Sequence, residues 1–229
     1  MTSPLRVLGH GEGVDVPANW PLVAHRVLGE GAVSDYVDDI VDTPAGERMH
    51  RQYLLHPGAV AVIALDEHDR VVVVRQYRHP VGFQLIEPPA GLLDADGESW
   101  LAAAQRELAE EAMLAADDWR LLVDMFTSPG CNSESIRFFL ARGLHAVPRP
   151  DGFVVEHEEL DMELCLVPLT DLLEAIYAGR VQSPTIVAGV LALEAARLGG
   201  RLDDLRPADS PWPAREVRHH LLDEIAKLA

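Results

Sequence analysis

The sequence predicts an α+β fold: a sandwich in which a mixed sheet lies between helices, preceded by a small N-terminal β unit. Strand-like apolar runs and helical patterns mix along the chain without the regular alternation of a parallel α/β sheet. The 229 residues exceed one small domain and fall short of two ordinary ones, and 48% of them are hydrophobic. We expect a β unit at 1–56, a central domain at 57–200, and a linker and helix at 201–229.

The first 56 residues alternate weakly between apolar and polar and contain a turn-rich stretch at 42–47. They predict three strands, at 23–28, 34–41 and 49–55. Three strands bury too little surface to be stable alone, so we expect this unit to pack on another surface.

The central region begins with two apolar runs, 59–65 and 71–74, joined by a polar turn at 66–70. This pattern predicts a hairpin of buried strands. Further strands are expected at 121–127, 136–141 and 162–168.

Two later helices have marked ends. Thr170 is expected to cap a helix at 171–178 that Gly179 terminates, and Ser183 to cap one that begins at Pro184 and ends at Leu198. After the proline-marked stretch 206–213 comes an amphipathic helix, whose apolar stripe either closes the core or serves a partner subunit. The stripe comprises Val217, Leu221, Leu222, Ile225 and Leu228.

The most informative segment is 91–114, where Glu107, Glu110 and Glu111 fall on little more than one helical turn. Like charges at this spacing weaken an isolated helix, and a divalent cation removes the repulsion. Mg²⁺ takes carboxylate oxygens and usually shares them with substrate phosphates. An apolar stripe beside the acids predicts that the helix docks on a core: Leu101, Ala104, Leu108 and Ala112.

This segment resembles the signature of the Nudix hydrolases: glycine, five residues, glutamate, seven residues, then Arg-Glu-aliphatic-any-Glu-Glu-any-Gly-aliphatic. The matching residues are Gly91, Glu98, Arg106, Glu107, Leu108, Glu110, Glu111 and Leu114. Six residues rather than five separate Gly91 from Glu98, which costs little in a loop. Met113 replaces the second glycine, so either the helix ends differently or the chain carries left-handed strain.

Other stretches resemble the ADP-ribose pyrophosphatase branch of that family. They are 57–62, 74–78, 87–91 and 128–134. Pro129 follows the signature by about fifteen residues, as in that branch. The resemblance implies hydrolysis of ADP-ribose to AMP and ribose 5-phosphate, with Mg²⁺ or Mn²⁺ as cofactor. It also implies a homodimer with exchanged N-terminal strands.

The resemblance suggests roles for individual residues. Glu107 and Glu111 would hold the metal, with help from Glu110 and the carbonyl of Ala90. Arg106 would orient these carboxylates. Glu159, or alternatively Glu158, in the acidic stretch 156–161 would act as general base.

Substrate contacts are expected from two regions. Arg75 and Arg78 leave the second apolar strand and could bind the diphosphate, and Glu87 is either a site residue or a strand-end salt bridge. The loop at 128–134 offers Pro129, Gly130, Ser133 and Glu134, of which the last two could bind a ribose. Relatives often carry Trp where this chain has Ile86, which leaves the base contact undefined.

The charge and composition of the chain limit the kinds of partner that it can bind. The net charge of −18 argues against general binding of nucleic acid or anionic membranes. No run of about 20 apolar residues occurs, and no signal peptide is apparent. Cys131 and Cys165 lack metal-ligand spacing, which favours two thiols in a reducing cytoplasm.

Two alternatives to an ADP-ribose hydrolase remain open. The same chemistry could act on another nucleoside diphosphate sugar or a dinucleotide. The second alternative is a non-hydrolytic sensor of ADP-ribose, to which Met113 could point, although every acid of the signature is present.

Overall fold

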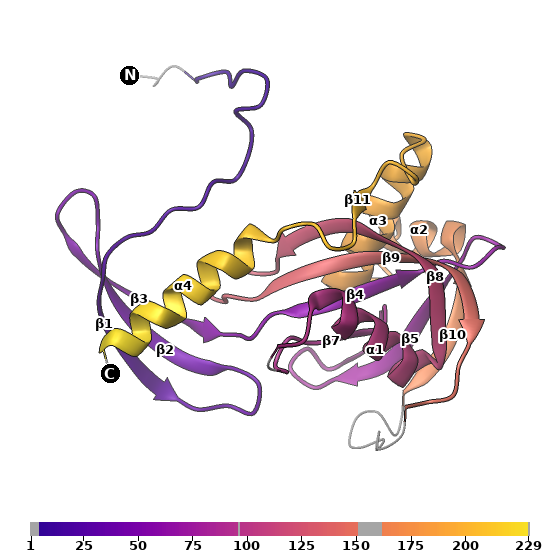
Figure 1. The fold of residues 1–229 in the computed structure, drawn as a ribbon, viewed down its shortest axis with the longest axis horizontal. Helices are drawn as coiled ribbons and strands as arrows, with labels where there is room; N and C mark the ends of the chain where they lie inside the picture. Colours follow the sequence, from indigo (N-terminus) through magenta and orange to yellow (C-terminus); the bar gives the residue numbers. More distant parts are fainter. Residues whose placement is uncertain (1–4, 96, 151–161, 229) are drawn as a thin grey trace.

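The structure is a computed structural model that describes residues 5–95, 97–150 and 162–228. Its strands form three sheets, and helices lie on both sides of the central sheets (Figure 1). This arrangement confirms the expected α+β sandwich with a mixed sheet and an N-terminal β unit. In the described residues, no helix is both long and apolar enough to cross a membrane.

The N-terminal unit is an antiparallel sheet with the strand order β1-β2-β3. Its strands lie within one residue of the predicted limits: β1 (Leu22–Gly29), β2 (Asp35–Asp42) and β3 (Arg48–Leu55). Figure 1 shows this sheet at one end of the molecule, with α4 (Pro213–Leu228) lying across it. Helix α4 contacts β1, while Val217 and Leu228 of the C-terminal stripe remain exposed.

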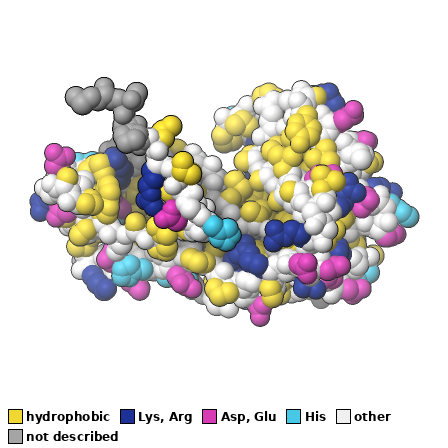
Figure 2. Space-filling view, turned by 90° about the horizontal axis from the view of Figure 1, so that it is seen from above, with side chains coloured by type: hydrophobic (Ala, Val, Ile, Leu, Met, Phe, Trp, Pro, Cys, Tyr) yellow, Lys and Arg dark blue, Asp and Glu magenta, His cyan; other side chains and the backbone are white. Residues whose placement is uncertain are grey.

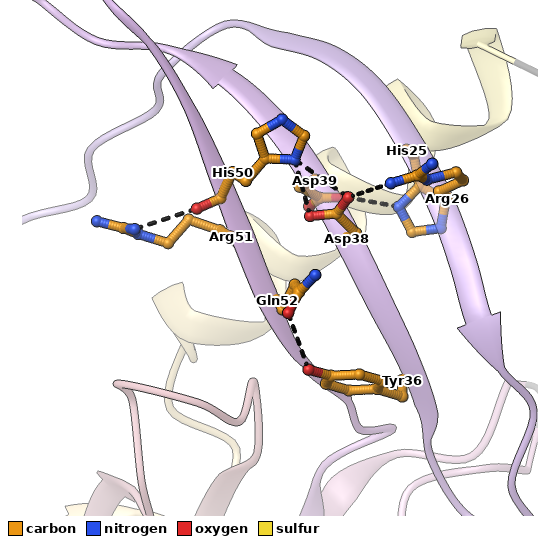
Figure 3. Close-up of polar contacts among 8 residues, drawn as sticks. All are labelled: His25, Arg26, Tyr36, Asp38, Asp39, His50, Arg51 and Gln52. Carbon is orange, nitrogen blue, oxygen red and sulfur yellow. Dashed lines mark hydrogen bonds and ion pairs between the residues drawn. The ribbon is translucent and has the colours of Figure 1, made fainter.

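Cross-strand polar pairs join this sheet (Figure 3). Asp38 accepts hydrogen bonds from Arg26 on β1 and from the His50 ring on β3, at 2.7 and 3.1 Å. Asp39 lies 2.6 Å from the His25 ring. The hydrogen bond from Arg26, assisted by His50, holds the pKa of Asp38 below its usual range. Polar pairing across strands therefore compensates for a sheet that is too small to build a large core.

The central sheet has five strands in the order β11-β8-β9-β4-β7. It contains β4 (Ala59–Ala64), β7 (Ala90–Leu92), β8 (Leu114–Phe126), β9 (Ser135–Ala146) and β11 (Arg206–Pro207). Strands β4 and β9 are parallel and the other pairs are antiparallel. An antiparallel sheet in the order β10-β5-β6 adjoins it, with β5 (Arg70–Arg78), β6 (Phe83–Glu87) and β10 (Glu163–Pro168).

The predicted hairpin of the first two central strands is wrong. Only a single bridge, between Leu65 and Val71, joins them, and β4 and β5 belong to different sheets. All residues of β4 are buried, because α1 covers one of its faces and α3 the other. A wholly apolar run shows that a strand is buried, but it does not identify the strand's partners.

Alternating residues of β4 supply the two cores. Val60 and Val62 pack with Leu108 of α1 (Trp100–Ala112) on one face. Ala61 and Ile63 pack on the other face with α2 (Leu169–Tyr177) and α3 (Pro184–Leu198). A Cβ at Gly189 of α3 would lie 2.4 Å from Ile63 Cδ1, so this glycine allows the close approach of α3 to the sheet.

The helix ends differ partly from expectation. Helix α1 ends at Ala112, and its C-cap residue Met113 adopts the left-handed conformation (φ 55°, ψ 39°), so the strained alternative is the one found. The predicted cap at Thr170 is wrong, because α2 begins at Leu169 after Pro168 without a side-chain cap. Ser183 precedes Pro184 at the N-cap of α3 as predicted, yet its hydroxyl makes no capping bond.

The C-terminal segment is anchored by Arg137 of β9, which is fully buried. Its guanidinium binds Asp124 of β8 and donates to the carbonyls of Ser210 and Pro211. It also lies 4.7 Å from the centre of the Trp212 ring. This anchor fixes the start of α4 against the central sheet.

Candidate active site

Helix α1 gathers its acids around one guanidinium. Arg106 donates to Glu107 Oε1 at 2.6 Å and, from the same Nη1, to Glu110 Oε2 at 2.9 Å. Its Nε and Nη2 bind both oxygens of Glu98 at 3.0 Å. The acids are 12–20% exposed, so they lie largely within the molecule rather than on a solvated face. Arg106 therefore connects the three carboxylates by hydrogen bonds.

Burial governs the electrostatics of this cluster. It raises the pKa of Glu107, and the opposing effect of Arg106 does not fully offset it. The hydrogen bonds that Arg106 donates to Glu98, and then the charge of Glu107, raise the pKa of Arg106 above its already high usual value. The guanidinium is thus fixed as a cation.

Gly91 provides the space that Glu107 occupies. A Cβ on Gly91 would lie 1.9 Å from Glu107 Oε1 and 2.0 Å from its carboxyl carbon. No side chain fits there without moving the carboxylate. The signature therefore requires glycine at this position for a steric reason that spacing alone does not reveal.

Two predicted metal ligands come together beside this glycine. The backbone N–H of Ala90 donates to Glu111 Oε2 at 3.1 Å. Strand β7, which carries Ala90, pairs with β4. The hydrogen bond holds the Glu111 carboxylate against the strand that carries the expected carbonyl ligand.

A cleft of about 440 Å³ adjoins these residues. Of the predicted site residues, it is lined by Arg78, Glu87, Ala90 and Glu134. It also contains residues that the sequence analysis missed: Val33, His56, Thr127, Ser183, Pro184 and Thr185. These come from strand ends, loops and the start of α3 that are distant in sequence, so no local pattern could have identified them.

His56 and Thr127 hold Glu134 in this cleft. Thr127 donates to Glu134 Oε2 at 2.7 Å, and His56 Nε2 lies 3.7 Å from Oε1. His56 Nδ1 accepts the N–H of Gly58 at 2.9 Å, which places the ring proton of the neutral form on Nε2, facing Glu134. Burial lowers the pKa of His56.

Glu87 also lines the cleft and is 8% exposed. Its Oε2 accepts hydrogen bonds from Gln76 at 2.8 Å and from Arg78 Nη2 at 2.7 Å. Its Oε1 accepts the hydroxyl of Ser183 at 3.1 Å. The salt-bridge interpretation of Glu87 therefore holds, and the pair it forms lies within the cleft.

Other predicted residues lie elsewhere. Pro129, Gly130 and Ser133 line a neighbouring hollow of about 260 Å³ beside β3. Arg75 pairs with exposed Glu163 at 2.8 Å, outside the residues that line the cleft. Glu158 and Glu159, the expected general bases, fall outside the described residues.

The residues of α1 suit a hard divalent cation by their chemistry, since Glu107, Glu110 and Glu111 offer only oxygens. Within the described part of the chain, no three acids are arranged as a finished coordination sphere, because Arg106 lies between Glu107 and Glu110. Metal binding would exchange part of the contact with Arg106 for contact with the ion.

Comparison with known proteins identifies related chains. Residues 55–186 match the family model described as NUDIX domain. The chain is 39% identical over 190 residues to an ADP-ribose pyrophosphatase of Mycobacterium tuberculosis (strain ATCC 25618 / H37Rv), covering 83% of this chain and 89% of that protein. It is 34% identical over 164 residues to an ADP-ribose pyrophosphatase of Bacillus subtilis (strain 168), covering 69% and 84%.

One solved structure, described as an ADP compounds hydrolase, superimposes with a TM-score of 0.66. The match covers 82% of this chain and all of that one, at 19% sequence identity. At this identity the likeness concerns the fold, and it agrees with the sandwich described above.

Proposed function

The chain belongs to the Nudix hydrolase family, and we propose that within it this enzyme hydrolyses the diphosphate of ADP-ribose to AMP and ribose 5-phosphate. The observation that carries the proposal is the junction of Gly91 with Glu107 and of Ala90 with Glu111 at the edge of the cleft. There the acids of α1 lie next to strand β7, which lines a cleft that also contains the Arg78 guanidinium and the Glu134 carboxylate. That combination suits a charged diphosphate joined to hydroxyl-bearing sugars.

Nudix enzymes generally depend on a divalent metal. Glu107 and Glu111, with Glu110 and the carbonyl of Ala90, would hold Mg²⁺ or Mn²⁺ here. Such an ion, when bound, would neutralise charge on the diphosphate and acidify a water. Arg106 keeps the acids oriented, through its contacts with Glu98, Glu107 and Glu110.

We assign proton removal from the attacking water to Glu159, with Glu158 as the alternative. Arg78 would bind a diphosphate oxygen, since its guanidinium lies in the cleft and is already oriented by Glu87. Glu134 would accept a hydrogen bond from a ribose hydroxyl. Roles for Arg75, Pro129, Gly130 and Ser133 rest on the family resemblance alone.

We also propose a homodimer, formed through the N-terminal sheet. In Figure 2 the surface is hollowed between this sheet, on the left, and the α2–α3 end, on the right, with hydrophobic side chains in view. The N-terminal unit exposes several apolar residues: Val27, Leu28, Val33, Tyr36 and Leu54. Light scattering of the purified protein tests this, and an active monomer would contradict it.

The substrate is tested by turnover of ADP-ribose, GDP-mannose and NADH in millimolar Mg²⁺, with identification of both products. Glu107→Gln serves as the matched inactive control. We expect ADP-ribose to have the highest kcat/KM. A preference for GDP-mannose or NADH would replace ADP-ribose as the assigned substrate. Tight binding of ADP-ribose without cleavage would favour a sensor.

A further inference from the structure

A row of hydrogen bonds connects the start of α3 with Arg78 in the cleft. Thr185 Oγ1 lies 2.9 Å from Ser183 Oγ, and Ser183 Oγ donates to Glu87 Oε1 at 3.1 Å. Arg78 binds the other oxygen of Glu87 through Nε and Nη2, at 2.9 and 2.7 Å. The row joins three elements, because Ser183 precedes α3, Glu87 ends β6 and Arg78 ends β5.

The direction of these bonds follows from the protons available. An ionised carboxylate only accepts, so Ser183 gives its single hydroxyl proton to Glu87. Thr185 must then donate to Ser183. Each donation polarises the next group, which strengthens the row in a site that is shielded from water. Ser183 is 1% exposed and Glu87 8% exposed.

Ser183 gives up a common stabilising role to make this bond. A serine at the N-cap usually accepts a backbone N–H of the first turn, which stabilises the helix. Ser183 stands at that position with an extended backbone but makes no such bond. Its hydroxyl donates to Glu87 instead, so the hydroxyl stabilises the cleft rather than the start of the helix.

The two oxygens of Glu87 are held differently. Gln76 and Arg78 both bind Oε2, whereas Ser183 is the one donor to Oε1 among the described residues. Without the serine hydroxyl, Oε1 has no donor among the described residues, and the carboxylate loses a contact that sets its position and orientation. Arg78, which donates both Nε and Nη2 to Oε2, would follow the carboxylate as it shifts.

We propose that Ser183 is a positioning residue that acts through Glu87 to fix the Arg78 guanidinium for binding an anionic oxygen of the substrate. Nη1 of Arg78 has no protein acceptor among the described residues, and the side chain is 48% exposed in the cleft. The proposal rests on the proposed function, because it requires a nucleoside diphosphate as substrate.

A double-mutant cycle with Ser183→Ala and Arg78→Gln tests it, on whichever of ADP-ribose and GDP-mannose the wild-type enzyme turns over. We expect Ser183→Ala to raise KM about three- to tenfold and to leave kcat within about twofold. Ser183→Thr, which keeps the hydroxyl, should restore KM. In the Arg78→Gln background, Ser183→Ala should have no further effect on KM.

Ser210→Ala is the matched control, because its hydroxyl bonds within its own turn, to the carbonyl of Pro207. It should leave both constants unchanged. If Ser183→Ala raises KM by the same factor in the wild-type and in the Arg78→Gln protein, Ser183 contacts the substrate itself, and the proposal is overturned. A lower kcat or thermal midpoint with unchanged KM would indicate a purely structural role and would also overturn it.

The turnover of the wild-type enzyme distinguishes a failure of the proposed function from a failure of the positioning role. If the wild-type enzyme cleaves GDP-mannose but not ADP-ribose, the substrate assignment fails while the cycle still tests Ser183. If it cleaves neither, ADP-ribose binding to the four proteins by calorimetry replaces KM. If Ser183→Ala raises the dissociation constant only when Arg78 is present, the positioning role is supported. If it raises the dissociation constant equally with and without Arg78, the role is overturned.

Discussion

Replacing Gly91 with alanine tests whether the close contact between β7 and α1 sets the position of Glu107. The new Cβ would lie 1.9 Å from Glu107 Oε1, whereas ordinary contact begins at 3.4 Å. Gly91 does not have a left-handed backbone, so alanine adds no backbone strain and the steric conflict stands alone. Glu107 must therefore withdraw by about 1.5 Å, and misplacement by about 1 Å costs on the order of 10²-fold in rate.

We expect Gly91→Ala to lower kcat/KM about 10²-fold, which corresponds to about 2.7 kcal/mol of transition-state stabilisation. Overpacking should also lower the free energy of unfolding by about 1–3 kcal/mol. The assay is steady-state turnover across a Mg²⁺ titration, together with thermal unfolding of the same samples. A displaced Glu107 should increase the Mg²⁺ concentration needed for half-maximal rate.

Gly29→Ala provides the matched control, because a Cβ at Gly29 meets nothing within 4 Å and its backbone is not left-handed. It should retain wild-type turnover and stability. Wild-type kcat/KM and Mg²⁺ dependence in Gly91→Ala would refute the reasoning, since Glu107 would then function from another position.

Three further predictions follow from other parts of the molecule. Glu111→Gln should lower kcat at least about 10²-fold with an unchanged thermal midpoint, since the amide can still accept the Ala90 N–H but carries no charge. Glu159→Gln should lower kcat by about 10²–10⁴-fold with little change in KM, and retention of the wild-type rate would remove it from proton transfer. Asp66→Asn should lower the free energy of unfolding by about 1 kcal/mol near pH 7. Burial raises the pKa of Asp66, but the bonds from the Arg70 N–H and guanidinium outweigh it and hold the pKa below its usual value. The stabilisation is present above the pKa that the Asp66 carboxyl has in the unfolded chain, and it is lost as the pH falls through the pKa of this carboxyl in the folded protein. The denaturation midpoints of the wild-type and Asp66→Asn proteins should therefore converge below about pH 4. A constant difference down to pH 2 would contradict this.

The sequence by itself determined the family to which this protein belongs. The spacing of Arg106, Glu107, Glu110 and Glu111 follows from helical periodicity, which is a local property, and it identified the family before any fold was known. The strands of the N-terminal unit and the helix that begins at Pro184 were also predictable, because apolar alternation and the preference of proline for the first helical position are local properties.

Tertiary structure decided which residues share a site. The hairpin was mispredicted because two apolar runs carry no information about their partners, and β4 pairs with β9 from another part of the chain. His56 and Ser183 enter the cleft only when strand ends and the start of α3 converge there. Such contacts depend on long-range packing, which a local pattern cannot specify, whereas the acids of α1 lie on a single helix and needed no tertiary contact to be recognised.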